Sequence, residues 1–205
     1  MKKLTNILIT LAILAGFMAC QEVKEVGEFD NWKERNTAFA DSLNSLTSGR
    51  EVITASETDA MELGRLYAIE TNTSTSITKQ YIYVKKLSAN QSGLRPYYTD
   101  RASVYYYGTY ITGTRFDGNF KGLSGALRDL NGSVNLPTEF DSPTEFAVNG
   151  NIVSGWKAAL QHMREGERWM VYIPYESAYG KSDSGTVPAY SLLCFDMIID
   201  KVKRQ

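Results

Sequence analysis

Tyrosine is the residue type in this sequence that most plainly suggests a chemical role. The segment 166–180 reads GERWMVYIPYESAYG, and its alternating run stops at Pro174, before Tyr175 and Tyr179. Proline ends a strand because it removes a backbone donor, so Tyr179 is expected in a short loop just beyond a strand. A tyrosine there offers an apolar ring and a hydroxyl that can donate a hydrogen bond. The 13 Tyr, 8 Phe and 3 Trp of the chain are ample for a core and rich in rings with a polar tip.

Metal, cofactor and nucleophile chemistry have little support in the sequence. His162 is the single histidine, which argues against a histidine-based metal site and leaves a Ser-His-Asp triad resting on one residue. We expect it to be a solvated side chain without a catalytic role. Cys20 and Cys194 lack CxxC spacing, so neither a zinc site nor a thioredoxin-like motif is indicated. We therefore expect no metal and no cofactor. The net charge of -1, without a basic block, argues against nucleic acid as a partner.

The N-terminus resembles a bacterial export signal. Two lysines at positions 2–3 precede an apolar run over residues 7–19, which is shorter than the roughly 20 residues that a membrane-spanning helix needs. Small residues precede Cys20, as in lipoprotein signals whose cysteine becomes lipidated, although Phe17 stands where Leu is usual. We expect a signal peptide at 1–19 and a lipid anchor on Cys20 that holds the protein at the bacterial cell envelope, on the outer membrane. The alternatives are an ordinary cleaved signal with an incidental Cys20, or a buried helix.

Residues 20–79 are expected to form a tether followed by a partly helical extension. A helix is predicted to begin at Asn31, because Glu34 follows this cap residue at the spacing of a capping box. Its apolar stripe consists of Trp32, Phe39, Leu43 and Leu46. Such a stripe is more typical of packing on its own domain than of pairing with a second copy. Residues 58–69 are compatible with either a helix or a strand.

From Gln80 onward the pattern is mainly that of strands. Strand regions are predicted over 80–87, 102–113, 168–173 and 192–199, and one helix over 152–164. The apolar residues of that helix share one face, and Gly166 follows its end. Runs of strands with one helix between them indicate an α+β fold, an antiparallel sheet wrapped over one short helix. We expect this domain to span residues 80–205.

Four segments of this region resemble the FKBP-type peptidyl-prolyl cis-trans isomerases. The family's strand–Tyr–x–Gly and Gly–x–x–Phe–Asp patterns are matched by VYYYG at 104–108 and GTRFD at 113–117. IVSGW at 152–156 resembles the family's Val-Ile-x-Gly-Trp, and the strand ending at Pro174 with AYG at 178–180 resembles its Ile-Pro…Ala-Tyr-Gly. Val187-Pro188 and LCFD at 193–196 resemble the closing loop and last strand. The resemblance covers about 80–202, and the whole arrangement resembles lipoprotein forms from Bacteroides-like bacteria.

The resemblance implies which side chains form a peptide-binding cavity. The residues implied as catalytic are Tyr106, Phe116, Asp117, Trp156, Tyr179 and Phe195. The residues implied as substrate-binding are Phe146, Ile152, Val153 and Val187. Trp156 would form the floor, and the Tyr179 hydroxyl would donate to a carbonyl of the bound peptide. Phe140 is the alternative to Phe146, and the residues alone do not decide between them. Taken singly, Trp156, Tyr106 and Phe116 are equally compatible with core packing.

The resemblance also implies an activity, which is isomerisation of X-Pro bonds during folding of exported proteins. Proline-containing polypeptides are then the expected partners, and the macrolides rapamycin and tacrolimus the expected inhibitors. Residues 116–155 are longer than in compact family members, and 121–142 could supply a lid or a partner surface. The alternative function is non-catalytic peptide or protein binding on the same scaffold, with the extension and the long loop as the working parts.

Overall fold

The computed structural model describes residues 27–47, 51–52, 54–71, 79–123 and 135–205. The chain divides into two compact units, residues 1–30 and 31–205. In the first unit the described residues 27–30 form a turn, in which the Gly27 amide donates to the Asp30 carboxylate. The predicted signal peptide and Cys20 lie outside the described residues. Within the described ranges, no helix is both long and apolar enough to cross a membrane.

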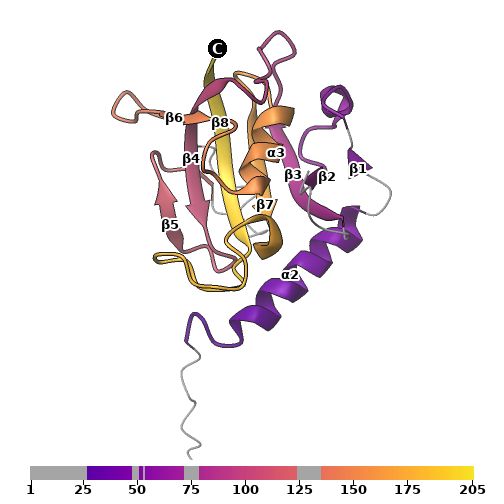
Figure 1. Ribbon diagram of the computed structural model, residues 1–205, viewed down its shortest axis with the longest axis vertical. Helices are drawn as coiled ribbons and strands as arrows, with labels where there is room; N and C mark the ends of the chain where they lie inside the picture. The colour runs from indigo at the N-terminus through magenta and orange to yellow at the C-terminus, as the bar shows by residue number, and fades with distance from the viewer. Residues whose placement is uncertain (1–26, 48–50, 53, 72–78, 124–134) are drawn as a thin grey trace, which may run out of the picture. The chain divides into compact units, whose positions relative to one another are not determined.

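The second unit is built on an eight-stranded sheet (Figure 1). Its strands lie in the order β1-β2-β3-β7-β8-β4-β5, and β6 pairs with β4 beside that path. In chain order the strands are β1 (Glu51–Val52), β2 (Leu66–Thr71), β3 (Gln80–Ser88), β4 (Arg101–Thr109), β5 (Arg115–Gly118), β6 (Thr144–Ala147), β7 (Arg168–Ile173) and β8 (Leu193–Lys203). All pairs are antiparallel except β1 with β2.

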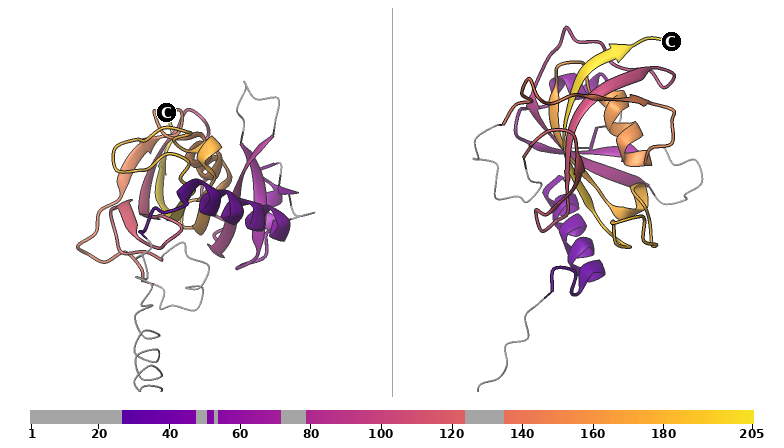
Figure 2. Two further views of the ribbon diagram at one scale, coloured as in Figure 1. Left: turned by 90° about the horizontal axis from the view of Figure 1, so that it is seen from below. Right: turned by 90° about the vertical axis from the view of Figure 1, so that its left-hand side faces the viewer.

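The two α-helices pack on opposite faces of the sheet. Each strand supplies residues to both faces, because successive side chains alternate between them. α3 (Ser154–His162) packs on the face that carries Ile82, Val84 and Ile173. α2 (Trp32–Thr47) brings Leu43 to the other face, beside Tyr83 and Tyr172. The views in Figure 2 show the sheet curved around α3. Two 3-10 turns, η1 (Glu57–Ala60) and η2 (Tyr175–Ser177), complete the described elements.

The α+β fold predicted from the sequence is confirmed, and the helix predicted from Asn31 begins at Trp32. Residues 58–69, which were compatible with helix or strand, contain both the end of η1 and the start of β2. The expected stripe is only partly buried, since Leu46 is exposed while Trp32 and Leu43 are buried. β2 pairs with β3 across the predicted boundary at residue 80, and the division into domains stays a prediction.

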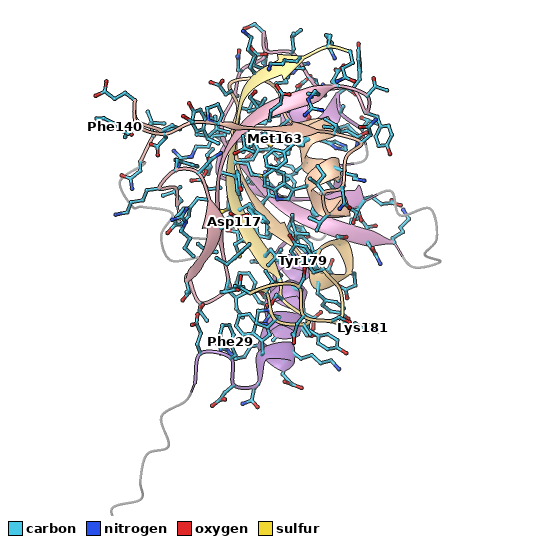
Figure 3. All side chains as sticks on the ribbon, turned by 60° about the vertical axis from the view of Figure 1, so that its left-hand side comes forward. Phe29, Asp117, Phe140, Met163, Tyr179 and Lys181 are labelled. Atoms are coloured by element: carbon cyan, nitrogen blue, oxygen red, sulfur yellow. The ribbon has the colours of Figure 1, made fainter. Side chains whose placement is uncertain are left out.

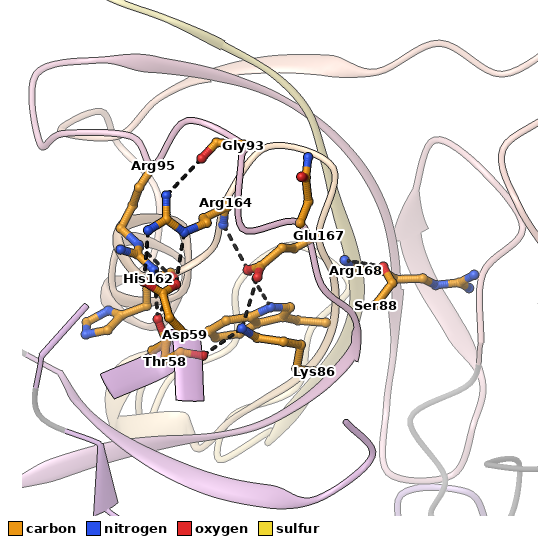
Figure 4. A network of polar contacts seen from close by, with 12 residues as sticks. Thr58, Asp59, Lys86, Ser88, Gly93, Arg95, His162, Arg164, Glu167 and Arg168 are labelled. Carbon is orange, nitrogen blue, oxygen red and sulfur yellow. Dashed lines mark hydrogen bonds and ion pairs between the residues drawn. The ribbon is translucent and has the colours of Figure 1, made fainter. Parts of the chain in front are cut away.

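Charged side chains inside the fold connect segments that lie far apart in the sequence (Figure 4). The Asp59 carboxylate accepts bonds from Arg164 at 2.8 and 2.9 Å and from Arg95 at 2.7 Å. These two guanidinium groups hold the pKa of Asp59 well below its usual range. Nearby, the buried Lys86 ammonium lies 3.0 Å from Glu167, whose other oxygen accepts from the Trp169 indole nitrogen. This network connects η1 to the C-terminal end of α3 and to β3. The N-terminal end of α3 takes no part in it and can line a site.

A second buried pair lies on the face that α2 covers. Arg168 of β7 donates two bonds to Asp196 of β8, at 2.8 and 2.5 Å, and both side chains are almost fully buried. The Leu123 amide donates to the same carboxylate at 2.7 Å. The pair therefore links the two central strands to the segment that leads into the long loop.

Candidate active site

A cavity of about 480 Å³ lies at the N-terminal end of α3, on the face of the sheet that this helix covers. It is lined mainly by aromatic and aliphatic side chains, with one carboxylate at its edge. The lining residues are Tyr106, Phe116, Asp117, Phe146, Asn151, Ile152, Val153, Trp156, Ala178, Tyr179 and Phe195. All six residues predicted as catalytic therefore converge on one cavity, together with three of the four predicted as substrate-binding. We refer to it below as the ring cavity.

Trp156 occupies the first turn of α3 and contacts rings from three strands. Its ring centroid lies 5.2 Å from Tyr106, 5.0 Å from Phe146 and 5.2 Å from Phe195, each in an edge-to-face arrangement. Such aromatic pairs add about 0.5–1.5 kcal/mol beyond area burial. Gly155 allows this approach, because a Cβ there would lie 2.4 Å from a methyl of Ile173. The helix start is thus held close against the sheet, and the indole forms a rigid floor.

The walls come from β4, β5 and β8, which pair side by side. Gly108 of β4 lies opposite both Asp117 and Phe195 in the strand registers. A Cβ on this glycine would lie 2.8 Å from the Phe195 ring and 2.9 Å from the Phe116 ring. The absence of a side chain at this position lets the two rings meet edge to face, with centroids 5.5 Å apart.

The polar edge of the cavity is an oriented carboxylate. The Tyr106 hydroxyl donates to Asp117 Oδ2 at 3.2 Å, and the Gly118 amide donates to Oδ1 at 2.7 Å. Burial and the neighbouring Asp117 carboxylate raise the pKa of Tyr106 to about 12. The hydroxyl therefore keeps its proton, and remains a donor to Asp117, throughout the neutral pH range. Nothing in this pair supplies a nucleophile for covalent chemistry.

Tyr179 stands at the mouth of the cavity, on the loop that follows η2. The loop is held by bonds from the Ser177 amide to Pro174 and from the Gly180 amide to Tyr175, at 3.0 and 2.8 Å. Gly180 has φ of 80°, a conformation that favours glycine. The Tyr179 side chain is 47% exposed, and its hydroxyl makes no hydrogen bond within the described part of the chain. Figure 3 labels Tyr179 and Asp117, which line the same cavity from separate elements.

A second row of rings supports the wall from behind and was not predicted. Tyr110 stacks on Phe116 with centroids 5.0 Å apart, and its hydroxyl donates to the Thr186 carbonyl at 2.7 Å. Trp32 of α2 contacts Tyr110 edge to face at 5.7 Å and donates to the Ser191 hydroxyl at 2.9 Å. The N-terminal helix therefore contacts the side chain that backs a wall of the cavity. Only the apolar stripe of α2 was visible in the sequence, and it does not say which ring Trp32 meets.

Several sequence-based expectations differ from the structure. Val187 does not line the cavity, because its side chain is buried in the core, and its backbone forms a bridge with Ser184. Phe140 is 89% exposed and lies away from the cavity, so Phe146 provides the wall. His162 is half-buried, and Nδ1 of its ring lies 2.7 Å from the Ala158 carbonyl oxygen. Asn151 and Ala178 also line the cavity but were not predicted. Their positions next to Ile152 and Tyr179 in the sequence could have indicated them.

The geometry can bind an apolar ring beside a hydrogen-bond donor. The cavity is open and is not filled by its own side chains, and its polar groups lie at the rim. Among the described residues, no group of three or more His, Cys, Asp or Glu side chains could hold a metal ion. What the arrangement can do is to surround a cyclic apolar side chain, remove water from the groups next to it, and fix a neighbouring carbonyl.

Comparison with known proteins defines the class. The sequence model of the FKBP-type peptidyl-prolyl cis-trans isomerase family matches residues 93–199, just over half of the chain. The chain therefore belongs to this family, and the resemblance drawn from its motifs is confirmed at that level.

Individual relatives support the same assignment. The macrophage infectivity potentiator of Trypanosoma cruzi is 37% identical over 117 residues, which are 56% of this chain and 50% of that protein. The FKBP-type 22 kDa peptidyl-prolyl cis-trans isomerase of Escherichia coli is 37% identical over 106 residues, or 51% of this chain and 42% of that protein. The outer membrane protein MIP of Legionella longbeachae is 31% identical over 114 residues, 55% of this chain and 41% of that protein. The chain thus spans half or less of the length of these relatives.

One solved structure shows the same fold. A peptidyl-prolyl cis-trans isomerase from Pseudomonas syringae superposes with a TM-score of 0.52 at 19% identity, over 87% of this chain and 98% of that one.

Proposed function

We propose that the protein is a peptidyl-prolyl cis-trans isomerase that acts on proline-containing polypeptides. The observation that carries the proposal is the ring cavity, in which Trp156, Phe195 and Tyr106 form an apolar recess beside the Tyr179 hydroxyl. Membership of the FKBP-type family supports it independently. No cofactor is needed for the mechanism that follows.

The proposed mechanism rests on desolvation. Rotation about an X-Pro bond crosses a barrier of about 20 kcal/mol, because amide resonance is lost when the bond twists. The planar amide is the more charge-separated form, so water stabilises it more than it stabilises the twisted form. A cavity that replaces water by rings raises the planar form relative to the twisted one, which is differential stabilisation of the transition state.

The polar groups at the rim have positioning roles in this proposal. The Tyr179 hydroxyl is exposed and without a protein partner in the described part of the chain, so it is available to donate to a substrate carbonyl. The Tyr106–Asp117 hydrogen bond holds one wall ring in place. Ile152 and Val153 form a rim that excludes water from the bound proline.

Isomerisation of a proline test peptide by the full-length chain would test the proposal. We expect Phe116→Ala and Asp117→Leu to lower kcat/KM by about tenfold or more, as loss of a substrate-positioning group does. Phe140→Ala is the matched control, since it removes a phenylalanine that lies outside the cavity. Unchanged activity in both cavity variants, or equal loss in the control, would refute the assignment of the site.

Macrolide binding provides a second test of the same cavity. We propose that rapamycin and tacrolimus occupy it and change the fluorescence of Trp156, which forms its floor. A titration of the full-length chain should show a saturable change that Phe116→Ala weakens and Phe140→Ala does not. A saturable change of equal affinity in both variants would place the macrolide elsewhere.

We further propose that the protein assists the folding of exported proteins at the cell envelope, anchored on the outer membrane by lipid on Cys20. The lysine pair, short apolar run and cysteine of residues 1–20 support this location. So does the name of the Legionella longbeachae relative, which describes it as an outer membrane protein. The division into signal 1–19, extension 20–79 and isomerase domain 80–205, in a lipoprotein form resembling those of Bacteroides-like bacteria, belongs to the same proposal.

Metabolic labelling with a clickable fatty acid would test the anchor. The wild-type chain should be labelled and fractionate with membranes, whereas Cys20→Ser should lose the label. Cys194→Ser is the matched control, because the Cys194 thiol is fully buried in β8 and is not available to a lipid. Membrane association of an unlabelled Cys20→Ser chain would show that another feature carries the attachment.

A further inference from the structure

A second cavity, of about 530 Å³, lies between α2, the start of β3 and the segment that precedes Tyr179. Its lining is mostly polar and contains two tyrosines and two carboxylates. The lining residues are Ala40, Asp41, Asn44, Lys79, Gln80, Tyr81, Tyr83, Pro174, Glu176 and Ser177. We refer to it as the acidic cleft. Nothing in the isomerase mechanism uses it.

The charge of the cleft is negative. Asp41 projects from α2, and Glu176 projects from η2. Lys79 is the single cation among the lining residues, and its ammonium already pairs with Glu70 at 3.0 Å. The carboxylates of Asp41 and Glu176 are thus left without a cation from the lining of the cleft.

Tyr83 adds a hydroxyl to the lining of the cleft. Its side chain is buried, with only 6% of the residue exposed, and its hydroxyl makes no hydrogen bond within the described residues. Burial and the charges of Asp41 and Glu176 raise the pKa of this hydroxyl to about 12, so both carboxylates act on it. The hydroxyl opens to the cleft, so its two acceptor lone pairs and its donor are available to a ligand. A ligand that donates hydrogen bonds would satisfy both the hydroxyl and the carboxylates.

We propose that the acidic cleft binds the cationic side chain of a lysine or arginine in a bound polypeptide. An ammonium or guanidinium group carries several donors and no acceptor, which matches two carboxylates and a hydroxyl oxygen. Tyr81 and Tyr83 also bring aromatic rings to the lining, and aromatic rings attract cations.

The position of the cleft favours a polypeptide as the source of that cation. Ser177 lines the acidic cleft and the next residue, Ala178, lines the ring cavity. Consecutive Cα atoms are about 3.8 Å apart, so the short segment that contains Ser177 and Ala178 borders both cavities. A polypeptide whose proline enters the ring cavity therefore passes beside the segment that also borders the cleft. This polypeptide source rests on the proposed function, whereas recognition of the cation rests on the cleft alone.

Amide chemical-shift titration by NMR of the full-length chain in a mild detergent would test the proposal. The probes are two peptides, Ac-Ala-Ala-Lys-Ala-Ala-NH2 and its Gln counterpart, which differ in charge but contain no proline. We expect saturable shifts at Asp41, Asn44 and Tyr83 with the lysine peptide and none with the glutamine peptide. Asp41→Asn and Glu176→Gln should each weaken binding about two- to fivefold, as partly exposed ion pairs do. Equal shifts with both peptides, or none at the cleft, would overturn the proposal.

Controls separate this site from general charge and from the isomerase activity. Glu62→Gln makes the same change of charge at an exposed site outside the cleft, and it should leave binding unchanged. Tyr83→Phe keeps the packed ring and removes only the hydroxyl, so it should fold and still bind more weakly; wild-type affinity would overturn the role of the hydroxyl. Cadaverine distinguishes the source of the cation, since binding as tight as that of the lysine peptide would overturn a polypeptide ligand. None of these readouts depends on catalysis, so loss of the proposed isomerase activity would be detected separately.

Discussion

Gly108→Ala should damage the ring cavity more than it damages the fold. The added methyl would lie 2.8 Å from the Phe195 ring and 2.9 Å from the Phe116 ring, whereas ordinary contacts begin near 3.4 Å. Each ring must therefore retreat by at least about half an ångström. The contacted atoms lie at the outer edges of the Phe195 and Phe116 rings, and both rings border an open cavity into which they can move. We expect a stability loss near the lower end of the roughly 1–3 kcal/mol typical of overpacking.

The effect on activity follows from the direction of that movement. Rings displaced into the cavity narrow the space that holds the proline, and a misplacement of 1 Å can cost about a hundredfold in rate. We expect Gly108→Ala to lower kcat/KM about tenfold, which corresponds to about 1.4 kcal/mol. The assay is isomerisation of a proline peptide, with urea unfolding of the same preparation to measure the free energy of unfolding.

Gly64→Ala provides a control of comparable instability away from the cavity. Gly64 has φ of +76°, where an alanine is strained by about 1 kcal/mol, and its Cβ would meet nothing within 4 Å. This variant should lose stability but keep wild-type kcat/KM. If Gly108→Ala also kept wild-type kcat/KM while folded, the two rings would not be the walls that set the reaction.

Three further predictions concern parts of the fold around the site. The pKa of Asp59 is lower in the folded chain than its ordinary value of 3.8, so this carboxylate stabilises the fold above about pH 4 and the contribution is lost as the pH falls further. Urea unfolding between about pH 2 and 7 should therefore show a steeper acid loss in the wild-type chain than in Asp59→Asn, and equal slopes would contradict the arginine pairing. Tyr110→Ala removes the ring behind Phe116 and should lower kcat/KM. Tyr110→Phe keeps the stacked ring but loses one hydrogen bond, worth about 1 kcal/mol, and should retain activity. Equal kinetics in the two variants would refute a supporting role for the ring. Asp196→Ala leaves the Arg168 guanidinium buried without its partner and should reduce the free energy of unfolding by about 3–5 kcal/mol, while a loss below 1 kcal/mol would show that water reaches the pair.

The site was predictable because its residues lie in short motifs with fixed backbone roles. The motifs identified the lining residues through their resemblance to a known family, whereas the close helix start at Gly155 and the space for two rings at Gly108 were found only in the structure. Val187 was assigned to substrate binding because Val187-Pro188 resembles the closing loop of the family, and this short motif says little about orientation. Its burial in the core, beside a bridge to Ser184, depends on tertiary packing that has no signature in composition.

The contribution of the N-terminal helix could not be predicted to the same extent. An apolar stripe predicts burial but not the face that receives it, and the burial of the polar Asn36 was not indicated by its type. In the structure the Asn36 side chain accepts from the Leu192 amide at 2.7 Å and donates to the Trp32 carbonyl. These bonds satisfy a loop backbone group that would otherwise be buried without a partner. Partners so distant in sequence leave no trace in the periodicity of the helix.

The location of β8 in the sheet constrains when the chain can complete its fold. This strand is synthesised after the other described strands, yet it lies between β7 and β4 and pairs with both. Before residues 193–203 emerge, the described strands form two groups that no ladder joins, and Phe195 is absent from the ring cavity. The sheet can therefore close only once β8 has been made, through contacts of high sequence separation that form slowly. Until then the two groups of strands can form separately, and deletion of β8 would leave them without a ladder between them.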